Sequence, residues 1–293
     1  MTELQPSNHQ VFKLGLIGYP LSHSLSPNIH NAALNACGLE GSYSLFPINP
    51  QDKMGLQDLL TRVRSGEIHG LNVTIPHKQN VIPFFDELTP TAEAIGAVNT
   101  IYVSENKLVG DNTDAPGFLS DLKKFLIAET QSNEDRNALI LGAGGSARAV
   151  VYALLNDGWK VTIAARRIEQ AQQLVNSFVN HKIPVTICNL SNIEVSNIAL
   201  IVNTTPMGMT PNIDPSPLPE NLSLPRHVSI YDLVYNPRET KLVKDARAQG
   251  LNATTGLGML IEQAALSFEL WTGKNPPREL LRASIEQSLV SNL

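Results

Sequence analysis

The segment Ala138–Ala149, which reads ALILGAGGSARA, constrains the fold of this chain more than any other feature. It has the pattern of an apolar strand, a glycine-rich turn and the start of a helix. The turn consists of Gly142, Ala143, Gly144, Gly145 and Ser146, followed by Ala147 where such turns often carry a third glycine. The first glycine permits a tight turn, and the second lets the backbone approach a phosphate. The helix N-terminus adds free N–H groups.

An ordinary glycine-rich loop is the alternative interpretation of this turn. The context argues against it, because a second apolar strand, Lys160–Ala165, follows the helix and completes a βαβ unit. We therefore predict a Rossmann-type unit that binds a dinucleotide.

The end of the second strand indicates which dinucleotide is bound. NAD-binding units place Asp or Glu there, about 20 residues beyond the turn, to hold the ribose 2′-hydroxyl. This chain has Ala165, Arg166 and Arg167 at that point. Guanidinium groups suit a charge-assisted contact with a 2′-phosphate, so the sequence predicts NADP as the cofactor. Two solvated surface arginines are the alternative.

Strand-like and helical patterns alternate along the rest of the chain, which predicts an α/β fold with largely parallel sheets. The expected strands are Val11–Gly18, Ile68–Ile75, Ile95–Val103 and Lys107–Gly110. The expected helices are Pro27–Cys37, with Ser26 as N-cap and Gly38 as the stop, and Pro116–Glu129, with more helices from about Met259. Gln131–Asn137 and Pro211–Pro225 read as surface connections.

Composition restricts the class of protein. Hydrophobic residues make up 42% and charged residues 17% of the 293 residues, which is enough apolar material for folded cores. The net charge of −5 disfavours nucleic acid and anionic membranes as partners. Cys37 and Cys188 form no C-x-x-C pattern, and no H-E-x-x-H occurs, so we expect no disulfide framework and no metal. The first ten residues lack a signal-peptide pattern and no apolar run reaches about 18 residues, which favours a soluble cytoplasmic protein.

Polar residues gather where the predicted strands end, which is where open α/β sheets bind ligands. Ser24 and Ser26 stand at the entry to a helix whose N-terminus favours an anion such as a carboxylate. Lys78 and Asp114 form a possible acid/base pair for a carbonyl substrate. A helix cap for Ser26, and a salt bridge or a surface position for Lys78, are the alternatives.

Several motifs together resemble the shikimate dehydrogenase family, from about residue 13 to residue 285. They are HSLSP at His23–Pro27, NVTIPHK at Asn72–Lys78, GAVNT at Gly96–Thr100, GDNTD at Gly110–Asp114, GAGGSARA at Gly142–Ala149, NTTPMGM at Asn203–Met209, YDLVYNP at Tyr231–Pro237 and GLGMLIEQA at Gly256–Ala264. The resemblance implies NADPH-dependent, reversible reduction of 3-dehydroshikimate to shikimate, a step of chorismate and aromatic amino acid biosynthesis.

The resemblance also implies an architecture. It gives an N-terminal α/β substrate domain with a mixed sheet over residues 1–114, and a doubly wound, Rossmann-type NADP domain over residues 115–255. C-terminal helices over residues 256–293 pack back on the first domain.

Roles for individual residues follow from the same resemblance. Lys78 and Asp114 are the expected catalytic pair. The expected substrate ligands are Ser24, Ser26, Thr74, Asn99, Asp114, Tyr235 and Gln263. The expected cofactor contacts are Gly142, Ala143, Gly144, Gly145, Ser146, Ala165, Arg166, Arg167, Leu233 and Gly256.

The chain departs from the family pattern after the second nucleotide strand. Asn-Arg-Thr is usual there, whereas this chain has Ala165, Arg166 and Arg167, and a later arginine is replaced by Gln170. Family variants that use NAD or quinate tend to have an acid where this chain has Ile168. A quinate/shikimate dehydrogenase with relaxed specificity and a non-catalytic NADP-binding paralogue are the alternative functions. The oligomeric state is open, with a homodimer as one alternative.

Overall fold

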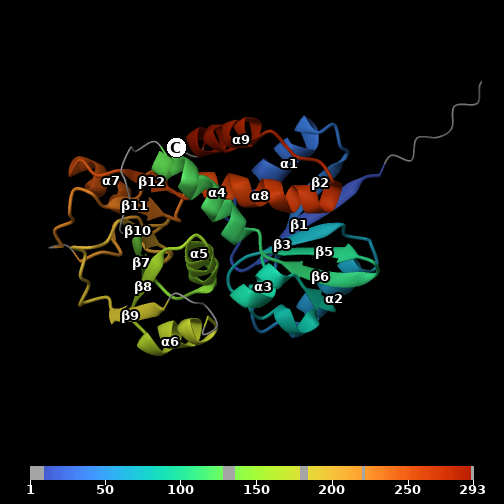
Figure 1. Cartoon of the computed structure of the whole chain (residues 1–293). Coiled ribbons are helices and arrows are strands. Elements are labelled where there is room, and N and C mark those ends of the chain that lie inside the picture. Colours follow the sequence, from blue (N-terminus) through green and yellow to red (C-terminus); the bar gives the residue numbers. More distant parts are fainter. Residues whose placement is uncertain (1–9, 128–135, 179–183, 220–221, 292–293) are drawn as a thin grey trace, which may run out of the picture. The chain divides into compact units, whose positions relative to one another are not determined.

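The computed structural model describes residues 10–127, 136–178, 184–219 and 222–291 (Figure 1). The chain forms two compact units and passes between them more than once. Unit 1 comprises the described parts of Met1–Leu88, Val98–Asp111 and Ala264–Leu293, and unit 2 comprises those of Thr89–Ala97 and Asn112–Gln263. The domain boundaries expected at 114/115 and 255/256 stay a prediction.

Unit 1 is built on a mixed sheet with the strand order β2-β1-β3-β5-β6-β4. The strands are β1 (Phe12–Gly18), β2 (Gly41–Pro47), β3 (Gly70–Val73), β4 (Glu87–Leu88), β5 (Thr100–Ser104) and β6 (Lys107–Asp111). β1 is parallel to both β2 and β3, whereas β5 is antiparallel to β3 and β6. The mixed sheet expected for the N-terminal part is thereby confirmed.

Local sequence explains two features of this sheet. β1 is buried from Leu14 to Gly18, as expected for an apolar strand inside a sheet. The hairpin between β5 and β6 turns at Glu105 and Asn106, both with positive φ (50° and 62°). This left-handed geometry suits a tight hairpin turn.

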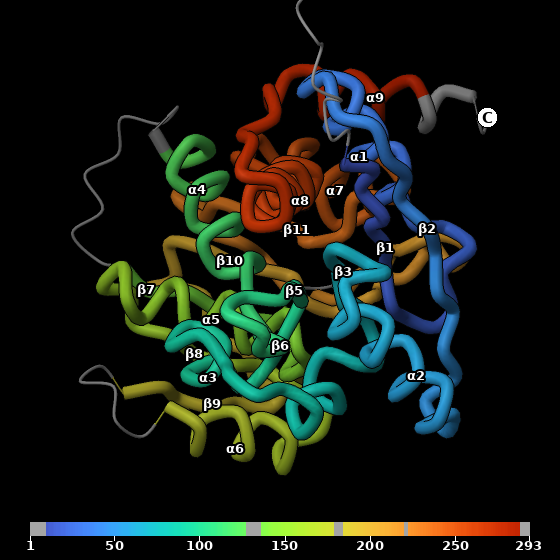
Figure 2. The backbone as a smooth tube through the Cα atoms, turned by 90° about the vertical axis from the view of Figure 1, so that its right-hand side faces the viewer, coloured from blue at the N-terminus to red at the C-terminus, as the bar shows by residue number. Residues whose placement is uncertain are grey.

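The helices of unit 1 come from both ends of the chain. They are α1 (Ser26–Ala36), α2 (Lys53–Arg64), the 3₁₀ turn η1 (Ile82–Phe84), the later part of α8 (Leu257–Thr272), and α9 (Arg278–Ser291). α1 and α9 pack side by side (Figure 2). Trp271 of α8 covers Gly70, where any Cβ would lie 2.2 Å from the indole, and its Nε1 donates to the Ile101 carbonyl at 3.0 Å.

Unit 2 contains a parallel sheet with the strand order β12-β11-β10-β7-β8-β9. The strands are β7 (Asn137–Leu141), β8 (Lys160–Ala165), β9 (Val185–Asn189), β10 (Leu200–Asn203), β11 (Ser229–Asp232) and β12 (Ala253–Thr255). Its helices are α3 (Pro90–Ile95), α4 (Asp114–Ile127), α5 (Gly145–Asn156), α6 (Ile168–Asn176), α7 (Lys241–Ala248) and the beginning of α8.

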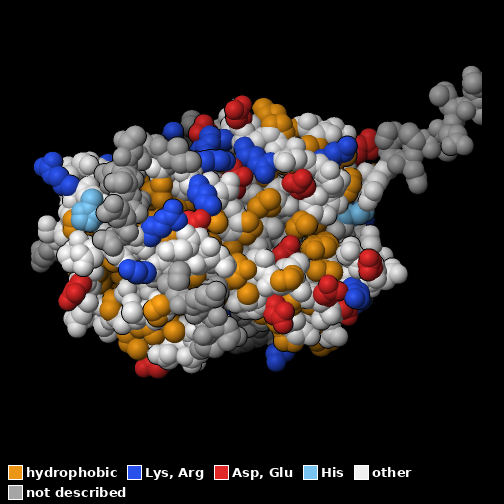
Figure 3. Space-filling view, viewed as in Figure 1, with side chains coloured by type: hydrophobic (Ala, Val, Ile, Leu, Met, Phe, Trp, Pro, Cys, Tyr) orange, Lys and Arg blue, Asp and Glu red, His pale blue; other side chains and the backbone are white. Residues whose placement is uncertain are grey.

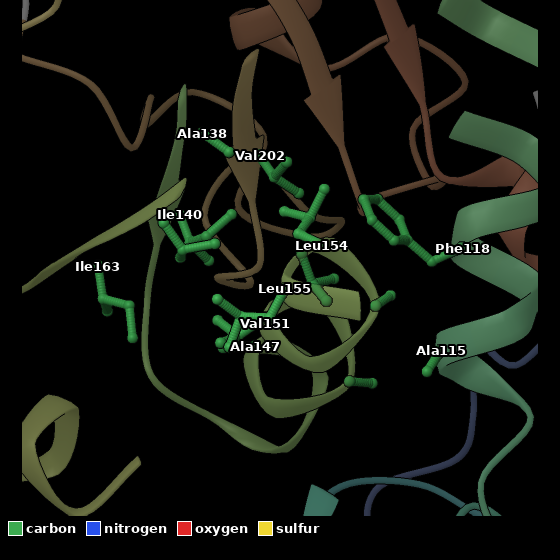
Figure 4. Packing of buried hydrophobic residues seen from close by; sticks show 14 of the residues in the cluster. Ala115, Phe118, Ala138, Ile140, Ala147, Val151, Leu154, Leu155, Ile163 and Val202 are labelled. Atoms are coloured by element: carbon green, nitrogen blue, oxygen red, sulfur yellow. The ribbon is translucent and has the colours of Figure 1, made fainter. Parts of the chain in front are cut away.

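Alternate residues of β7 enter two different cores, which is why both faces of this sheet are covered. Ala138 and Ile140 pack with α4, α5 and α6, in a cluster that includes Phe118 and Leu154 (Figure 4). Leu139 belongs to the opposite cluster, which includes α7. The strand order and the two covered faces confirm the doubly wound, Rossmann-type prediction.

Two local predictions are wrong. Ser26 is not the N-cap of α1: Leu25 occupies that position in the right-handed helical region (φ −88°, ψ −3°), and no side chain caps the helix. The predicted strand Ile95–Val103 begins only at Thr100, because Thr89 caps a short helix, α3, whose end at Gly96 has φ +66°. Gly38 does follow the end of α1 and has φ +65°.

Some expectations fall outside the described residues, namely most of the connection Gln131–Asn137 and the last two residues of Pro116–Glu129. Among the described residues, no helix is long and apolar enough to cross a bilayer. Acidic and basic side chains occur together on the face shown in Figure 3, in keeping with the small net charge of −5.

Candidate functional site

One edge of the sheet in unit 1 collects the predicted polar residues. The carboxyl ends of β1 and β3 meet there, because Ile17 pairs with Val73 in parallel register. β5 runs the opposite way, so its first residue, Thr100, lies opposite Asn72 of β3 and Asp111 of β6. Residues that follow β1, β3 and β6, and those that precede β5, therefore lie at the same edge.

Ser24 and Ser26 lie beyond β1 at this edge. The Ser24 N–H donates to the Leu21 carbonyl at 3.1 Å, and the Ser24 Oγ accepts from the Ser26 N–H at 3.3 Å. Ser24 thus accepts from the first N–H of α1, although it does not occupy the N-cap position. Both serines are half-buried at the N-terminus of α1, which is an electrostatically favourable place for a carboxylate.

Thr74, Lys78 and Asn99 are brought to the same edge by backbone hydrogen bonds. The Thr74 N–H donates to the Ile17 carbonyl at 2.8 Å, and the Lys78 carbonyl accepts from Val98 at 2.7 Å. The Asn99 carbonyl accepts from Val73 at 2.8 Å. Thr74 and Lys78 are half-buried, whereas Asn99 is only 2% exposed. A hydroxyl, an amide and an ammonium group, beside the hydroxyls of the two serines, can therefore meet one small oxygen-rich ligand.

Asp114 and Gln263 belong to unit 2, where two helices bring them into one neighbourhood. Asp114 begins α4 and is 5% exposed, and Gln263 on α8 is 9% exposed. Gly117 lies one helical turn after Asp114 and close to α8. A Cβ on Gly117 would be 2.7 Å from the backbone nitrogen of Gln263. Since Lys78 lies in unit 1, its pairing with Asp114 stays a prediction.

Asn112 has a positioning function that the sequence pattern did not suggest. Its Oδ1 accepts from the N–H groups of Asp114 and Ala115 at 3.1 and 3.3 Å, and its Nδ2 donates to the Ala97 carbonyl at 2.9 Å. It thus caps α4 at the residue expected to be catalytic. The combination of Asn with a helix start two residues later was the available signal.

The glycine turn joins β7 to α5 as predicted. Gly142 has φ +105°, and a Cβ there would lie 2.9 Å from Thr204 Oγ1, so both conformation and space require glycine. Gly144 is the N-cap residue of α5, and nothing lies within 4 Å of the position of its Cβ. The open space at the helix N-terminus fits a phosphate group.

The two arginines lie where the sequence predicts them, directly after β8. Ala165 is buried at the end of that strand, whereas Arg166 and Arg167 are exposed at the start of α6. Among the described residues, neither guanidinium has a hydrogen-bond or ion-pair partner. The donor set therefore fits the 2′-phosphate of NADP at the expected distance from the glycine turn in the chain.

Leu233 and Gly256 are also brought together. A Cβ on Gly256 would lie 2.1 Å from the Leu233 carbonyl oxygen, so glycine allows this close approach. Tyr235 follows in the same loop, and burial raises the pKa of its phenol above the ordinary value. Its hydroxyl is therefore neutral near pH 7.

A buried carboxylate, Asp232, lies at the end of β11 and was missed by the sequence interpretation. It accepts from Asn203 Nδ2 at 2.8 Å, Thr240 Oγ1 at 2.6 Å and the Val234 N–H at 3.0 Å. Burial raises the pKa of Asp232 to about 6 despite these three donors. The side chain joins the strand ends of β10 and β11 beneath the loop that carries Leu233.

Within the part of the chain that the structure describes, no group of three or more His, Cys, Asp or Glu side chains is arranged to hold an ion.

Comparison with known proteins gives consistent matches along the chain. The family model "Shikimate dehydrogenase substrate binding domain" matches residues 16–101, "Shikimate / quinate 5-dehydrogenase" residues 126–233, and "Shikimate 5'-dehydrogenase C-terminal domain" residues 256–286. A curated NADP(+) shikimate dehydrogenase from Carboxydothermus hydrogenoformans is 40% identical over 92% of this chain and 95% of its own length.

Solved structures agree. A shikimate dehydrogenase in complex with NADP+ superposes with a TM-score of 0.86 at 37% identity, covering 95% of this chain and 96% of its own. The Thermus thermophilus shikimate 5-dehydrogenase, solved with shikimate, gives a TM-score of 0.81 at 37% identity, covering 95% and 99%. A quinate dehydrogenase from Corynebacterium glutamicum with NAD gives 0.84 at 31% identity, covering 94% and 99%. With these identities over nearly the whole chain, the protein belongs to the shikimate dehydrogenase family.

Proposed function

We propose that this protein catalyses the NADPH-dependent, reversible reduction of 3-dehydroshikimate to shikimate. The observation that carries the proposal is the polar edge in unit 1, where Ser24, Thr74, Lys78 and Asn99 come together. This combination of groups suits a hydroxylated ring with one carboxylate. The shikimate complex of the Thermus thermophilus relative, at 37% identity, supports the same substrate class.

The substrate is held at its two polar ends. Ser24 and Ser26 bind the carboxylate with their hydroxyls at the N-terminus of α1, with help from Tyr235. Thr74, Asn99, Asp114 and Gln263 bind the ring oxygens. Charge-assisted hydrogen bonds to the carboxylate contribute about 1.5–3 kcal/mol each, so the serines supply much of the orientation.

Lys78 transfers the proton, and Asp114 orients the groups between which it moves. As the substrate carbonyl carbon is reduced, Lys78 donates a proton to its oxygen, which becomes the product hydroxyl. Asp114 accepts a hydrogen bond from that hydroxyl and from the lysine, which orients both. In the reverse direction Lys78 accepts the proton from the hydroxyl of shikimate.

The cofactor supplies the hydride when it is bound. The pyrophosphate would be held at the N-terminus of α5 by the residues of the glycine turn, Gly142, Ala143, Gly144, Gly145 and Ser146. Ala165, Arg166 and Arg167 would hold the adenosine 2′-phosphate, and Leu233 and Gly256 would lie at the nicotinamide end. The open space at Gly144 and the unpartnered guanidinium groups described above support this arrangement.

A panel of substrates and cofactors tests the proposal. The purified protein is assayed at 340 nm with 3-dehydroshikimate and NADPH or NADH, and with shikimate or quinate and NADP+ or NAD+. We expect turnover with the shikimate pair and preference for the phosphorylated cofactor. Absence of turnover with every pair would support the non-catalytic paralogue instead.

Quinate is the second candidate substrate, since the Corynebacterium glutamicum quinate dehydrogenase is 31% identical. Arg166 and Arg167 are followed by Ile168, where variants that use NAD or quinate tend to have an acidic residue. This sequence argues for NADP and shikimate. A kcat/KM for quinate with NAD+ equal to or above that for shikimate with NADP+ would reverse this order. A homodimer and a cytoplasmic location stay predictions, which light scattering and cell fractionation test.

A further inference from the structure

His77 is a buried histidine in the loop that carries Lys78, and the proposed function gives it no role. The loop follows β3 in unit 1. His77 is 2% exposed, whereas its neighbour Lys78 is half-buried. Burying a polar ring is costly unless it is hydrogen-bonded, so the partner of this imidazole indicates what its burial achieves.

The side chain of His77 reaches the segment that follows β2. Its Nε2 lies 2.7 Å from the carbonyl oxygen of Ile48. A carbonyl oxygen only accepts, so Nε2 carries a proton and donates it. The Ile48 N–H in turn donates to the Gly18 carbonyl at 3.1 Å, at the end of β1. The imidazole is therefore tied to a segment that is itself bonded to the sheet.

The main chain of His77 is held within its own loop. Its N–H donates to the Thr74 carbonyl at 2.9 Å, and its carbonyl accepts from the Val81 N–H at 3.1 Å. The Thr74 N–H donates to the Ile17 carbonyl of β1 at 2.8 Å. The loop thus forms a compact turn whose start is bonded to the sheet.

The backbone from His77 to Lys78 has anchors on both sides of β3. In the strand order β2-β1-β3-β5, the Ile48 segment follows β2 on one side of β3, and Val98 precedes β5 on the other. The ring of His77 bonds to the first segment, and the Lys78 carbonyl accepts from the Val98 N–H at 2.7 Å. Loss of the imidazole bond releases the anchor on the β2 side, directly next to Lys78 in the chain.

We propose that His77 is a positioning residue for Lys78 in proton transfer. Its imidazole fixes the Lys78 backbone relative to the ends of β1 and β2, so that the ammonium group meets the substrate oxygen in a productive geometry. The Nε2 proton of His77 is engaged by Ile48, and His77 acts through Lys78 rather than on the substrate. The inference rests on the proposed function, in which Lys78 is the proton donor.

His77→Phe tests this inference, because it keeps a buried ring and removes the Nε2 donor. A displaced acid loses much of its contribution, so we expect kcat with shikimate and NADP+ to fall about tenfold to a hundredfold, with both KM values within about threefold. His77→Gln has a side-chain amide that can donate to the Ile48 carbonyl, and it should restore most of kcat.

The matched control is His69→Phe. His69 directly precedes β3, at the opposite end of that strand from Lys78, and its Nδ1 accepts from the Lys13 N–H at 3.1 Å. The same substitution therefore removes another hydrogen bond between an imidazole and the main chain of unit 1, away from the candidate edge. Its kcat should stay near that of the wild type.

A double variant separates positioning from general destabilisation. If His77 acts through Lys78, adding His77→Phe to Lys78→Ala lowers kcat no further than Lys78→Ala alone. An unchanged kcat in folded His77→Phe, even with a lower Tm, would overturn the inference, as would an equal loss of kcat with and without Lys78. His77→Met, which also lacks a donor, replaces His77→Phe if the latter does not fold.

The same set of variants distinguishes this inference from the proposed function. If Lys78→Ala is slow and His77→Phe retains the wild-type kcat, the positioning role fails and the proposed function stands. If Lys78→Ala itself retains the wild-type kcat, the role of Lys78 under the proposed function fails, and the positioning role of His77 fails with it.

Discussion

Lys78 carries the proton transfer of the proposed reaction, and its removal separates chemistry from binding. We expect Lys78→Ala to lower kcat by about 10²–10⁴, the usual contribution of a positioned acid/base, with the KM for shikimate within about tenfold. Steady-state kinetics of the purified variant measure both. The control is Lys107→Ala, which removes an exposed lysine paired with Glu87 and should leave kcat unchanged. An unaltered kcat in Lys78→Ala would exclude the lysine from the mechanism.

We expect Arg166 and Arg167 to determine the choice of cofactor. Each charge-assisted contact with the 2′-phosphate contributes about 1.5–3 kcal/mol, so the wild type should prefer NADPH over NADH by about tenfold to a thousandfold. Arg166→Ala should lose most of this preference through the KM for NADPH, with kcat nearly unchanged, because the phosphate is remote from the reacting carbon. Both groups are exposed, so the preference should weaken at high salt.

The measurement for this prediction is kcat/KM for both cofactors in wild type, Arg166→Ala and Arg167→Ala. Arg226→Ala serves as control, since Arg226 is exposed and precedes β11, at the opposite edge of the parallel sheet from the glycine turn. Equal use of NADPH and NADH by the wild type would contradict the assignment.

The β7–α5 connection allows a matched pair of substitutions. Gly142→Ala forces a side chain into φ +105° and against Thr204 Oγ1, so we expect a loss of stability of about 1–3 kcal/mol and a lower Tm. Gly144→Ala meets no atom within 4 Å, so its Tm should stay near that of the wild type. Its added methyl group occupies the space expected for the pyrophosphate, and NADPH should bind at least tenfold more weakly.

Thermal melts and fluorescence titrations with NADPH test the pair. Tight NADPH binding by Gly144→Ala would place the pyrophosphate elsewhere. An unchanged Tm for Gly142→Ala would mean that the turn relaxes at no cost.

Elements with strong local signals were predictable from sequence. Lys160–Ala165 coincides with β8, because its apolar run follows the turn residues Asp157 and Gly158. β2 was not predicted, since an edge strand buries only part of its residues and its pattern is weak: one of its seven residues, Tyr43, is buried. Its place in the sheet depends on pairing with β1, a contact between segments that are not neighbours in the sequence.

The residues of the candidate site divide in the same way, into those with a strong local signal and those without one. Motif residues such as Gly142 and Arg166 lie where local sequence places them, directly after their strands. Asp232 was missed because its function depends on distant partners such as Asn203. Asn112 had a local signal, an Asn just before a helix start, but its bond to Ala97 comes from a distant segment. Ser26 was misassigned because a helix cap depends on the backbone angles of the preceding residue, which the sequence does not reveal.

The two units should respond to acid in opposite directions. Burial lowers the pKa of His30 in unit 1 from 6.5 to about 3, so the unfolded chain takes up a proton that the folded unit refuses. The free energy of unfolding of unit 1 therefore falls by up to about 5 kcal/mol as the pH falls from 6.5 to 3. Asp232 in unit 2 has its pKa raised from 3.8 to about 6. The free energy of unfolding of unit 2 therefore falls by about 3 kcal/mol as the pH rises from about 4 to about 6.

Hydrogen exchange at about pH 4.5 and about pH 6.5, resolved by segment, measures these opposite trends. His30→Phe, which keeps a ring stacked on Tyr43, should remove the acid sensitivity of unit 1 only. Asp232→Asn should remove the pH dependence of unit 2 only, because the amide oxygen still accepts from Asn203 and Val234. Parallel pH dependence in the two units would contradict the assignment of the two groups.

The division of the chain between the units has a consequence for biosynthesis on the ribosome. Unit 2 ends at Gln263, whereas unit 1 also needs Ala264 and the residues after it. A nascent chain that has emerged up to Gln263 thus holds every segment of unit 2, while the sheet of unit 1, although translated first, still lacks Trp271 over Gly70 and Ser267 beside Thr100. The half of the protein that is translated first is therefore the half completed last. Until then, unit 1 exposes apolar side chains of its core, to which chaperones can bind.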